Sequence, residues 1–172
     1  QVPVINMLNA RYLIYDLNSP PLLNPHAMGN AWFVNNYKTV NNADEEIAAL
    51  KEIDPKNEAT IDKRFSEFVG NKKFQKDETG GITLTEYKPN YLKYTAKAGS
   101  EQLTVFSEIY YAKGWNAFVD GKEVPHFRVN YILRGLVLPA GDHTVEFKFH
   151  PKSYYTGNTV SLASSILLIL AL

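Results

Sequence analysis

The chain has 172 residues, enough for one domain with a sizeable core, and 45% of them are hydrophobic. Its 18 basic residues, lysine and arginine, equal its 18 acidic residues, so no net charge attracts nucleic acid, and we expect no nucleic-acid partner. The absence of cysteine excludes disulfides, thiol catalysis and cysteine-ligated metals. The 11 tyrosines suit either β-sheets or a sugar-contacting surface.

The N-terminal segment predicts little regular structure. Residues 1–17 have near-helical spacing that passes into a strand-like run at 12–15, so we expect a short helix that leads into a strand. Residues 1–10 lack the basic start and sustained apolar run of a signal peptide. The stretch 18–29 contains helix and strand breakers and is expected to form an irregular loop, after which a strand is expected at 31–37.

One regular helix is expected at residues 43–53. Asn42 can cap its N-terminus, and Glu45 completes a capping box three residues later. Asp54 precedes a proline, and such a residue is biased away from helical conformation, which ends the helix. The residues expected to share its core-facing side are Ala43, Ile47 and Leu50.

Residues 57–69 are ambiguous. Their apolar spacing fits a helix, whereas the run at 59–61 would fit an edge strand, and the local pattern leaves both open. The lysine-rich stretch 70–76 is expected to be a solvated loop.

β character is continuous through the second half of the chain. Residues 82–87 and 91–98 predict strands joined by a short turn, and 103–150 alternates between strand patterns and turn signals, the clearest at Asp120-Gly121 and 139–141. We expect a mainly β fold with minor α content: an antiparallel β-sandwich or jelly-roll-like domain of about eight strands, with one or two short helices and a C-terminal apolar helix. The predicted core residues are Trp32, Leu92, Tyr94, Val105, Val145, Phe147 and Phe149.

The C-terminal segment predicts a membrane helix. From Val160 it reads VSLASSILLILAL without a charge, and a membrane span needs ~20 apolar residues. Two tyrosines at 154–155 precede this run, where interfacial anchors would lie. We expect a β-sandwich at 1–158 and the truncated start of a transmembrane helix at 159–172. The alternative is a buried C-terminal helix of a soluble domain.

No motif predicts catalysis or cofactor binding: nucleotide loops, zinc and calcium signatures and nucleophile elbows are absent from the sequence. We expect neither a cofactor nor a metal site, because the histidines fall on expected loops or solvent-facing strand positions: His26, His126, His143 and His150. The β-region carboxylates worth considering for glycoside hydrolysis are Glu86, Glu108, Asp120 and Asp142. Turns account for the two aspartates, and a buried pairing with Arg128 or Arg134 accounts for Glu108.

Aromatic side chains are the main candidates for ligand contact, because flat aromatic faces stack on sugar rings. The candidate carbohydrate contacts are Tyr110, Tyr111, Trp115, Tyr131 and Tyr154. For Trp115 we favour the alternative that its side chain covers the end of the core, since large aromatic residues near sheet ends are usually buried.

Several segments carry a resemblance to a known family. YYAKGWNAFVDGKEVP at 110–125 and NYILRGLVLPAGDHTVEFKFHPKSYYTGN at 130–158, followed by the apolar run, are similar to the C-terminal end of the bacterial membrane protein YfhO family. MLNARYLIY at 7–15 and NPHAMGNAWFV at 24–34 resemble the segments that lead into the same soluble domain. The resemblance touches most of the chain and favours a strand near 59–62.

This resemblance implies that the chain is a fragment of a larger polytopic protein. YfhO-family proteins resemble membrane glycosyltransferases that use polyprenyl-phosphate sugars at the outer face of the bacterial cytoplasmic membrane. Their catalytic acid lies in an early loop outside this segment, so no catalytic residue is carried over here.

The expected role is that of a non-catalytic extracytoplasmic, or periplasmic, domain that covers the active site, positions an acceptor polymer or contacts partners. Its expected partners are the membrane-embedded remainder of the parent chain and an envelope polysaccharide or lipid-linked sugar. An independent carbohydrate-binding module and a purely structural or protein-interaction domain stay open as alternatives.

Overall fold

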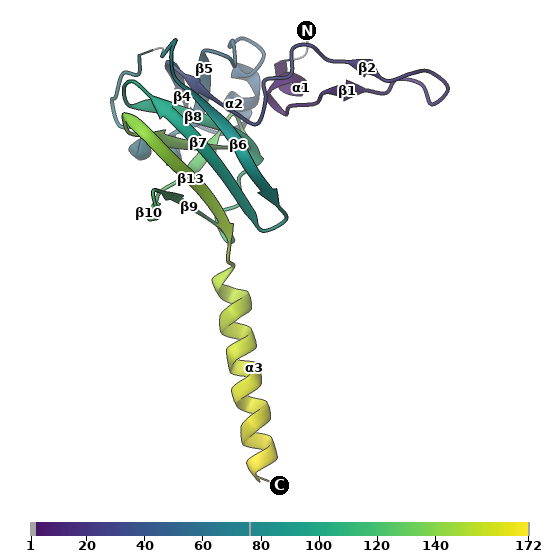
Figure 1. The fold of residues 1–172 in the computed structure, drawn as a ribbon, viewed down its shortest axis with the longest axis vertical. Coiled ribbons are helices and arrows are strands. Elements are labelled where there is room, and N and C mark those ends of the chain that lie inside the picture. Colours follow the sequence, from purple (N-terminus) through teal and green to yellow (C-terminus); the bar gives the residue numbers. More distant parts are fainter. Residues whose placement is uncertain (1–2, 76, 172) are drawn as a thin grey trace.

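The computed structural model describes residues 3–75 and 77–171, and within them two antiparallel sheets of five and four strands lie face to face (Figure 1). The strands of the five-stranded sheet are β6 (Gly81–Lys88), β7 (Tyr91–Ala98), β9 (Trp115–Val119), β10 (Lys122–Val124) and β13 (Gly141–Phe149). Those of the four-stranded sheet are β3 (Ala31–Val34), β8 (Gln102–Ile109), β11 (Phe127–Val129) and β12 (Leu133–Leu138). The spatial orders are β10-β9-β13-β7-β6 and β11-β12-β8-β3. The predicted mainly β, antiparallel fold is confirmed.

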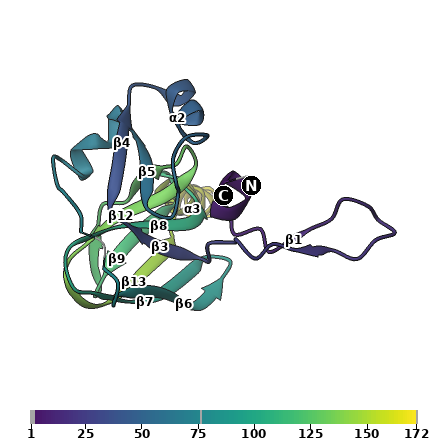
Figure 2. The same cartoon turned by 90° about the horizontal axis from the view of Figure 1, so that it is seen from above.

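A third layer, which the sequence did not predict, covers the other face of the four-stranded sheet, as Figure 2 shows from above. It contains α2 (Ala43–Ala49), the 3-10 helix η1 (Lys63–Phe68) and the parallel pair β4 (Asn36–Val40) and β5 (Glu58–Asp62). The strand expected near 59–62 is therefore present as β5. The following loop is exposed as expected except at Phe74, which is buried, while Lys76 lies outside the described residues.

The four-stranded sheet divides the interior into two cores. The first core lies between the two sheets and includes Leu92, Tyr94, Phe106, Leu136, Val145 and Phe147. The second core lies between the four-stranded sheet and the third layer and includes Val34, Ile61, Leu103, Val105, Phe127 and Val129. Strand β8 contributes to both, because successive side chains of a strand point to opposite faces and here both faces are covered.

The predicted core residues fall into three groups. Leu92, Tyr94, Val145 and Phe147 are buried in the first core, as expected. Val105 is also buried, but in the second core, so the predicted set does not share one interior. The remaining two are half-buried because each lies near a sheet boundary: Trp32 and Phe149.

The strand expected at 31–37 divides at Asn35. Residues 31–34 pair with β8, whereas β4 leaves that sheet and pairs with β5. The backbone N–H groups of Asn35 and Asn36 both donate to the carbonyl oxygen of Asn57, at 3.1 Å each, which satisfies the donors at the break.

Helix α2 starts where expected but is shorter, ending at Ala49. The side chain of Asn42 accepts a hydrogen bond from the Glu45 N–H at 2.9 Å, which confirms the cap. The Glu45 carboxylate accepts from the N–H of Asn41 rather than of Asn42. Of the three residues expected to face the core, Leu50 is buried and Ala43 is half-buried, but Ile47 is 42% exposed, while the Glu46 carboxylate is buried instead.

The two predicted turns have different roles. Asp120 and Gly121 have φ angles of 50° and 80°, which closes the β9–β10 hairpin as the sequence predicts. Gly141, with φ of 129°, begins β13 after a reversal that crosses from the four-stranded to the five-stranded sheet. The stretch 103–150 is therefore not a simple series of hairpins.

An arm projects sideways from the body near α1 (Pro3–Met7). It consists of β1 (Tyr12–Leu13) and β2 (Leu22–Leu23), which pair with each other inside the segment expected to be a strand followed by a loop. Its large apolar side chains are exposed: Tyr12, Ile14, Tyr15, Leu17, Leu22 and Leu23.

Candidate functional site

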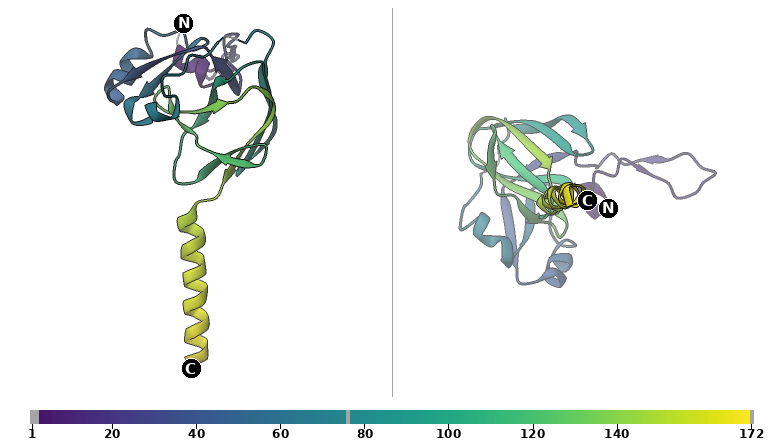
Figure 3. Two further views of the ribbon diagram at one scale, coloured as in Figure 1. Left: turned by 90° about the vertical axis from the view of Figure 1, so that its left-hand side faces the viewer. Right: turned by 90° about the horizontal axis from the view of Figure 1, so that it is seen from below.

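Helix α3 (Lys152–Ala171) extends away from the body, as Figure 3 shows, and none of its residues is buried. Its 20 residues are long and apolar enough to cross a membrane, since a helix of that length spans about 30 Å, the thickness of the hydrocarbon core. A core helix of a soluble protein would be covered. The helix begins at Lys152, ahead of the boundary expected at 158/159, and Leu172 lies outside the described residues.

Three hydroxyl groups of α3 are satisfied within the helix. Thr159, Ser164 and Ser165 each donate to the carbonyl oxygen four residues earlier, at 2.9 Å. Such internal bonds are required where neither water nor another protein group is available. This pattern fits a lipid environment.

Short contacts fix the junction between β13 and α3. The backbone N–H of His150 donates to the carbonyl oxygen of Gly114 at 2.7 Å, and the His150 ring stacks on Tyr155 with centroids 3.8 Å apart. Gly114 must lack a side chain, because a Cβ there would lie 2.2 Å from the ring of Phe149. These contacts orient the start of α3 relative to the sandwich.

Aromatic side chains surround this junction, and we call the following set the junction aromatics: Tyr111, Trp115, Phe149, Tyr154 and Tyr155. Tyr111 and Trp115 both contact Phe149, with ring centroids 6.5 and 5.3 Å away, and Tyr154 contacts Tyr155 at 5.3 Å. Aromatic residues concentrate at membrane–water interfaces. The junction aromatics lie where α3 would enter the headgroup region.

A buried guanidinium lies behind the junction aromatics. Arg134 is only 2% exposed, and its guanidinium lies 4.3 Å from the ring centroid of Trp115 and 5.0 Å from that of Phe147. Its Nε donates to the carbonyl oxygen of Ile109 at 3.0 Å. Burial lowers the pKa of Arg134 and raises the pKa of the nearby Glu108, while their mutual attraction opposes both shifts. Glu108 is thus associated with Arg134, as one of the two expected pairings proposes, without a direct ion pair among the described contacts.

His126 corrects the expectation that all histidines are solvent-facing. Its ring packs between Tyr110 and Phe147, with centroids 5.3 and 5.7 Å away. Burial, with a smaller effect of Arg134, lowers the pKa of His126 to about 4, so the ring is neutral at physiological pH. Among the described residues, three interior polar atoms near this position lack a hydrogen-bond partner: Tyr94 Oη, His126 Nε2 and Arg134 Nη1.

The five candidate carbohydrate contacts do not form one surface. Tyr111, Trp115 and Tyr154 lie at the junction, where Tyr111 and Tyr154 are exposed and Trp115 is half-buried. Tyr110 packs edge-on against Phe65 and His126. The guanidinium of Arg128 lies over the ring of Tyr131, with its Cζ atom 5.6 Å from the centroid of that ring. Their role in carbohydrate contact stays a prediction.

Sequence reasoning missed a buried ion-pair network that joins the third layer to the four-stranded sheet. Arg128 of β11 contacts Glu46 of α2 at 2.8 Å and Asp62 of β5 at 3.3 Å, and both carboxylates are fully buried. Arg64 binds both oxygens of Asp62, which lowers the pKa of Asp62 to about 2. Burial raises the pKa of Glu46. Arg128 therefore pairs with these residues and not with Glu108.

The network also holds a turn in an unfavourable conformation. Tyr131 has a φ angle of 72°, uncommon for a bulky residue, and its N–H donates to Glu46 Oε1 at 2.9 Å. Asn130 has a φ of 49° and exchanges hydrogen bonds with Thr60. The only sequence signal for Glu46 was its place within the acidic first turn of α2, which favours a helix-dipole role instead.

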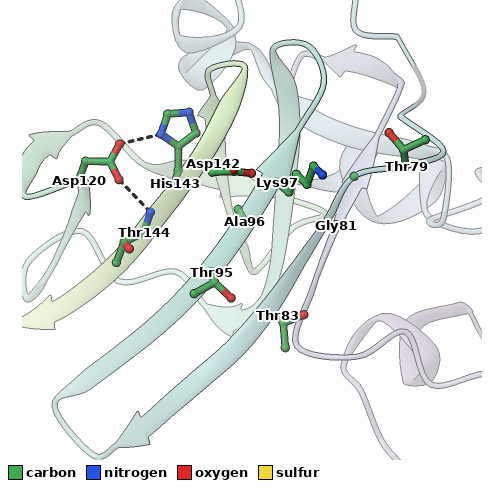
Figure 4. Close-up of a pocket in the computed structure, with 11 residues that line it drawn as sticks. Thr79, Gly81, Thr83, Thr95, Ala96, Lys97, Asp120, Asp142, His143 and Thr144 are labelled. Atoms are coloured by element: carbon green, nitrogen blue, oxygen red, sulfur yellow. Dashed lines mark hydrogen bonds and ion pairs between the residues drawn. The ribbon is translucent and has the colours of Figure 1, made fainter.

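At the other end of β13, a polar hollow opens on the outer face of the five-stranded sheet (Figure 4). Asp120 accepts a hydrogen bond from the Thr144 N–H at 2.8 Å, and its other oxygen lies 2.6 Å from His143 Nδ1. His143 Nε2 lies 3.2 Å from the carbonyl oxygen of Ala140. Because both ring nitrogens face oxygen acceptors, the protonated form of His143 is favoured.

This contact predicts a pH dependence of stability. Its bond to Asp120 raises the pKa of His143, so the stabilisation is full below the ordinary histidine pKa of about 6.5 and is lost as pH rises through the raised value. The same bond lowers the pKa of Asp120. The stabilisation contributed by the ionised Asp120 carboxylate is therefore lost only as pH falls below about 4. We expect His143→Gln to lower the melting temperature more at pH 5.5 than at pH 8.5.

Circular-dichroism melts of both proteins at the two pH values measure this difference. The effect is expected to be small, since the Asp120 side chain is 52% exposed and solvent screens the pair. An equal or larger loss at pH 8.5 would contradict the assignment of the charged contact.

The described residues contain no group of three or more histidine, cysteine, aspartate or glutamate side chains that could hold a metal ion. Among the described residues, a β-sandwich is followed by one helix that is long and apolar enough to span a bilayer, an arrangement that fits a membrane protein.

Comparison with models of protein families identifies the family to which the chain belongs. Residues 66–161 match the family described as bacterial membrane protein YfhO, and the match covers more than half of the chain. The chain therefore belongs to the YfhO family. No curated protein and no solved structure matches it.

Proposed function

We propose that this chain is an extracytoplasmic, non-catalytic domain of a polytopic bacterial membrane protein that resembles polyprenyl-phosphate-sugar-dependent glycosyltransferases. The observation that carries the proposal is α3, which leaves the last strand of the sandwich directly and has no buried residue. Family membership supports the membrane assignment. The proposed location is the outer, or periplasmic, side of the cytoplasmic membrane.

The junction supports a role close to the membrane surface. The junction aromatics and the buried Arg134 lie at the end of the sandwich from which α3 leaves, so this end would face the headgroups and any lipid-linked sugar. We propose that the domain covers a membrane-side active site formed by the remainder of the parent chain. Its proposed partners are that remainder and an envelope polysaccharide or lipid-linked sugar, and no catalytic step is assigned to this chain.

Deletion of residues 160–172 tests the membrane assignment. We expect the shortened chain to keep the folded sandwich with a similar melting temperature, since no residue of α3 is buried and the junction contact of Tyr155 with His150 is retained. It should also lose its association with phospholipid vesicles, because that association depends on the apolar helix. Vesicle flotation and thermal melts measure the two properties. Unfolding upon deletion would show that α3 belongs to the core and would favour an independent module.

A charge in the helix provides a matched control. Leu162→Arg should abolish vesicle association and leave the melting temperature unchanged, because Leu162 lies at the middle of α3 and a central arginine costs about 2.5 to 3.5 kcal/mol of insertion, whereas Leu162→Ala should retain association. Since this chain has no cysteine, Glu123→Cys on the exposed part of β10 adds one labelling position, and the protein without this substitution is the control for cysteines elsewhere in the parent chain. In the protein expressed in its bacterium, labelling of this position by a membrane-impermeant maleimide in intact cells is expected. Protection in intact cells with labelling after lysis would place the domain on the cytoplasmic side.

A further inference from the structure

The hollow on the outer face of the five-stranded sheet has a volume of about 620 Å³ and is lined by the ends of three neighbouring strands. It lies at the start of β13, whereas α3 follows the end of β13, so the hollow is at the part of the domain remote from the junction (Figure 1). Its lining combines threonine hydroxyls with one lysine, one histidine and two aspartates.

Register places the lining residues in two rows across the strands. Thr83 of β6, Thr95 of β7 and Thr144 of β13 are direct cross-strand neighbours. Adjacent strands lie about 4.8 Å apart, so the row offers hydroxyls at regular intervals. None of these three hydroxyls bonds to a described residue, so all of them are available to a ligand.

The second row explains why the surface is hollow. It contains Gly81, Lys97 and Asp142 in register. Gly81 has no side chain, and a Cβ built there would meet nothing within 4 Å, so the surface is lowered at this position. Lys97 and Asp142 lie next to each other on the neighbouring strands β7 and β13 (Figure 4).

Two aspartates hold the borders of the hollow in place. Asp120 binds His143 and the Thr144 N–H on one side. On the other side, Asp77 accepts hydrogen bonds from the N–H groups of Thr79, Gly80 and Gly99, which lowers the pKa of Asp77 to about 2. A rigid border reduces the entropy lost when a ligand binds.

The composition of the lining selects the class of ligand. Lys97, together with His143 when it is protonated, offsets the negative charges of Asp120 and Asp142, so the hollow has no excess positive charge to attract a polyanion. It has no phenylalanine, tyrosine, tryptophan or large aliphatic side chain to bury an apolar molecule. It offers donors and acceptors side by side on neighbouring strands, which is the pattern that hydroxyl groups satisfy, because each hydroxyl both donates and accepts.

We propose that this hollow binds a neutral saccharide chain through its vicinal hydroxyl groups. Threonine is common in strands for its β propensity, so the threonine row alone would carry no such inference. The hollow, the rigid borders and the unused hydroxyls together distinguish this face from an ordinary solvated sheet. That this saccharide is the acceptor polymer of a transferase would rest on the proposed function, whereas saccharide binding itself does not.

Titration of the full chain in detergent micelles with maltohexaose, cellohexaose and hexa-N-acetylchitohexaose, all neutral, followed by backbone NMR, tests the proposal. We expect at least one hexamer to shift resonances of residues 79–83, 95–97 and 142–144, and hexaethylene glycol, which has no vicinal hydroxyls, to shift none. The double variant Thr83→Val, Thr95→Val should bind about tenfold more weakly, since two hydrogen bonds are lost. Gly81→Leu should abolish binding by filling the hollow, and its backbone needs no positive φ.

Thr85→Val is the matched control. Thr85 lies on the same strand and is exposed, but it is outside the hollow and its hydroxyl donates to the carbonyl oxygen of Lys93. The affinity of the Thr85→Val variant for the hexamer should stay within about twofold of that of the unmodified chain. The proposal is overturned if no hexamer binds, if hexaethylene glycol binds equally, or if the hollow variants bind normally. If the chain binds a hexamer but fails the vesicle and labelling tests, the saccharide site is supported and the proposed membrane parent protein is refuted. Failure of the saccharide proposal can therefore be told apart from failure of the proposed function.

Discussion

Replacement of Phe147 by alanine is expected to destabilise the domain by ~3 to 5 kcal/mol, the range for a fully buried aromatic side chain. Phe147 has no exposed surface and lies at the centre of the first core. Its ring meets Phe106 edge-on with centroids 4.9 Å apart and Tyr94 at 6.2 Å. The loss combines the transfer of the ring to water with the cavity that a closely packed interior cannot close.

Chemical denaturation of the full chain in detergent measures this loss. Phe149→Ala is the matched control on the same strand face, and it should cost less than half as much because Phe149 is half-buried. Phe147→Leu should cost about 1.5 kcal/mol or less, since it retains most of the volume. If Phe147→Ala and Phe149→Ala are equally mild, the register of β13 is wrong.

Phe147 also covers the buried charge of Arg134. The guanidinium lies 5.0 Å from the Phe147 ring centroid and has an unpartnered Nη1 among the described contacts. A cavity left by Phe147→Ala adjoins this charge and can admit water that hydrates it. The measured loss should therefore fall toward the lower end of the range.

Local patterns allowed the strands of the two sheets to be predicted. Apolar residues at every second position indicate one buried face on β7 (Leu92, Tyr94 and Ala96) and on β13 (Val145 and Phe147). The Asp120-Gly121 pair marks the turn between β9 and β10. The Asn42 cap was also readable, because its partner Glu45 lies three residues away. Such features depend on neighbours in the sequence.

The third layer depends on contacts between distant residues and could not be read locally. Val105 and Phe106 are adjacent, yet they enter different cores because separate segments cover the two faces of β8. Ile47 was expected inside by its apolar character, but Glu46 occupies that place since Arg128, 82 residues later, neutralises it. An apolar pattern cannot reveal a buried charge whose partner is so remote.

The candidate site was predicted only in part. The junction unites Tyr111, Trp115 and Tyr154, which the sequence singled out for their aromatic faces. The polar hollow was missed, because its two rows arise from cross-strand register among three segments. Threonine and glycine in strands carry no local signal of a cavity. Only the assembled sheet shows that Gly81 lies beside Lys97.

Replacement of Arg128 by methionine is expected to destabilise the domain by ~3 to 5 kcal/mol, because removal of one partner leaves a buried charge uncompensated. The charge affected is that of Glu46, whose carboxylate is fully buried. Asp62 keeps its compensation through both oxygens from Arg64. Lys38→Met is the matched control, since the Lys38–Glu52 pair is exposed and should be worth less than about 1 kcal/mol.

A double-mutant cycle with Glu46→Gln separates this charge effect from lost packing. Glutamine retains an acceptor for the Tyr131 N–H, which holds the strained turn, while removing the charge. Glu46→Gln should destabilise the unmodified protein and stabilise Arg128→Met, and this reversal of sign is expected only if the two charges interact directly. The penalty of Arg128→Met should also shrink as pH falls toward the raised pKa of Glu46, because protonation removes the unpaired charge. A penalty that is constant with pH and insensitive to Glu46→Gln would mean that Arg128 stabilises the domain through packing against Phe65 and Tyr131 instead.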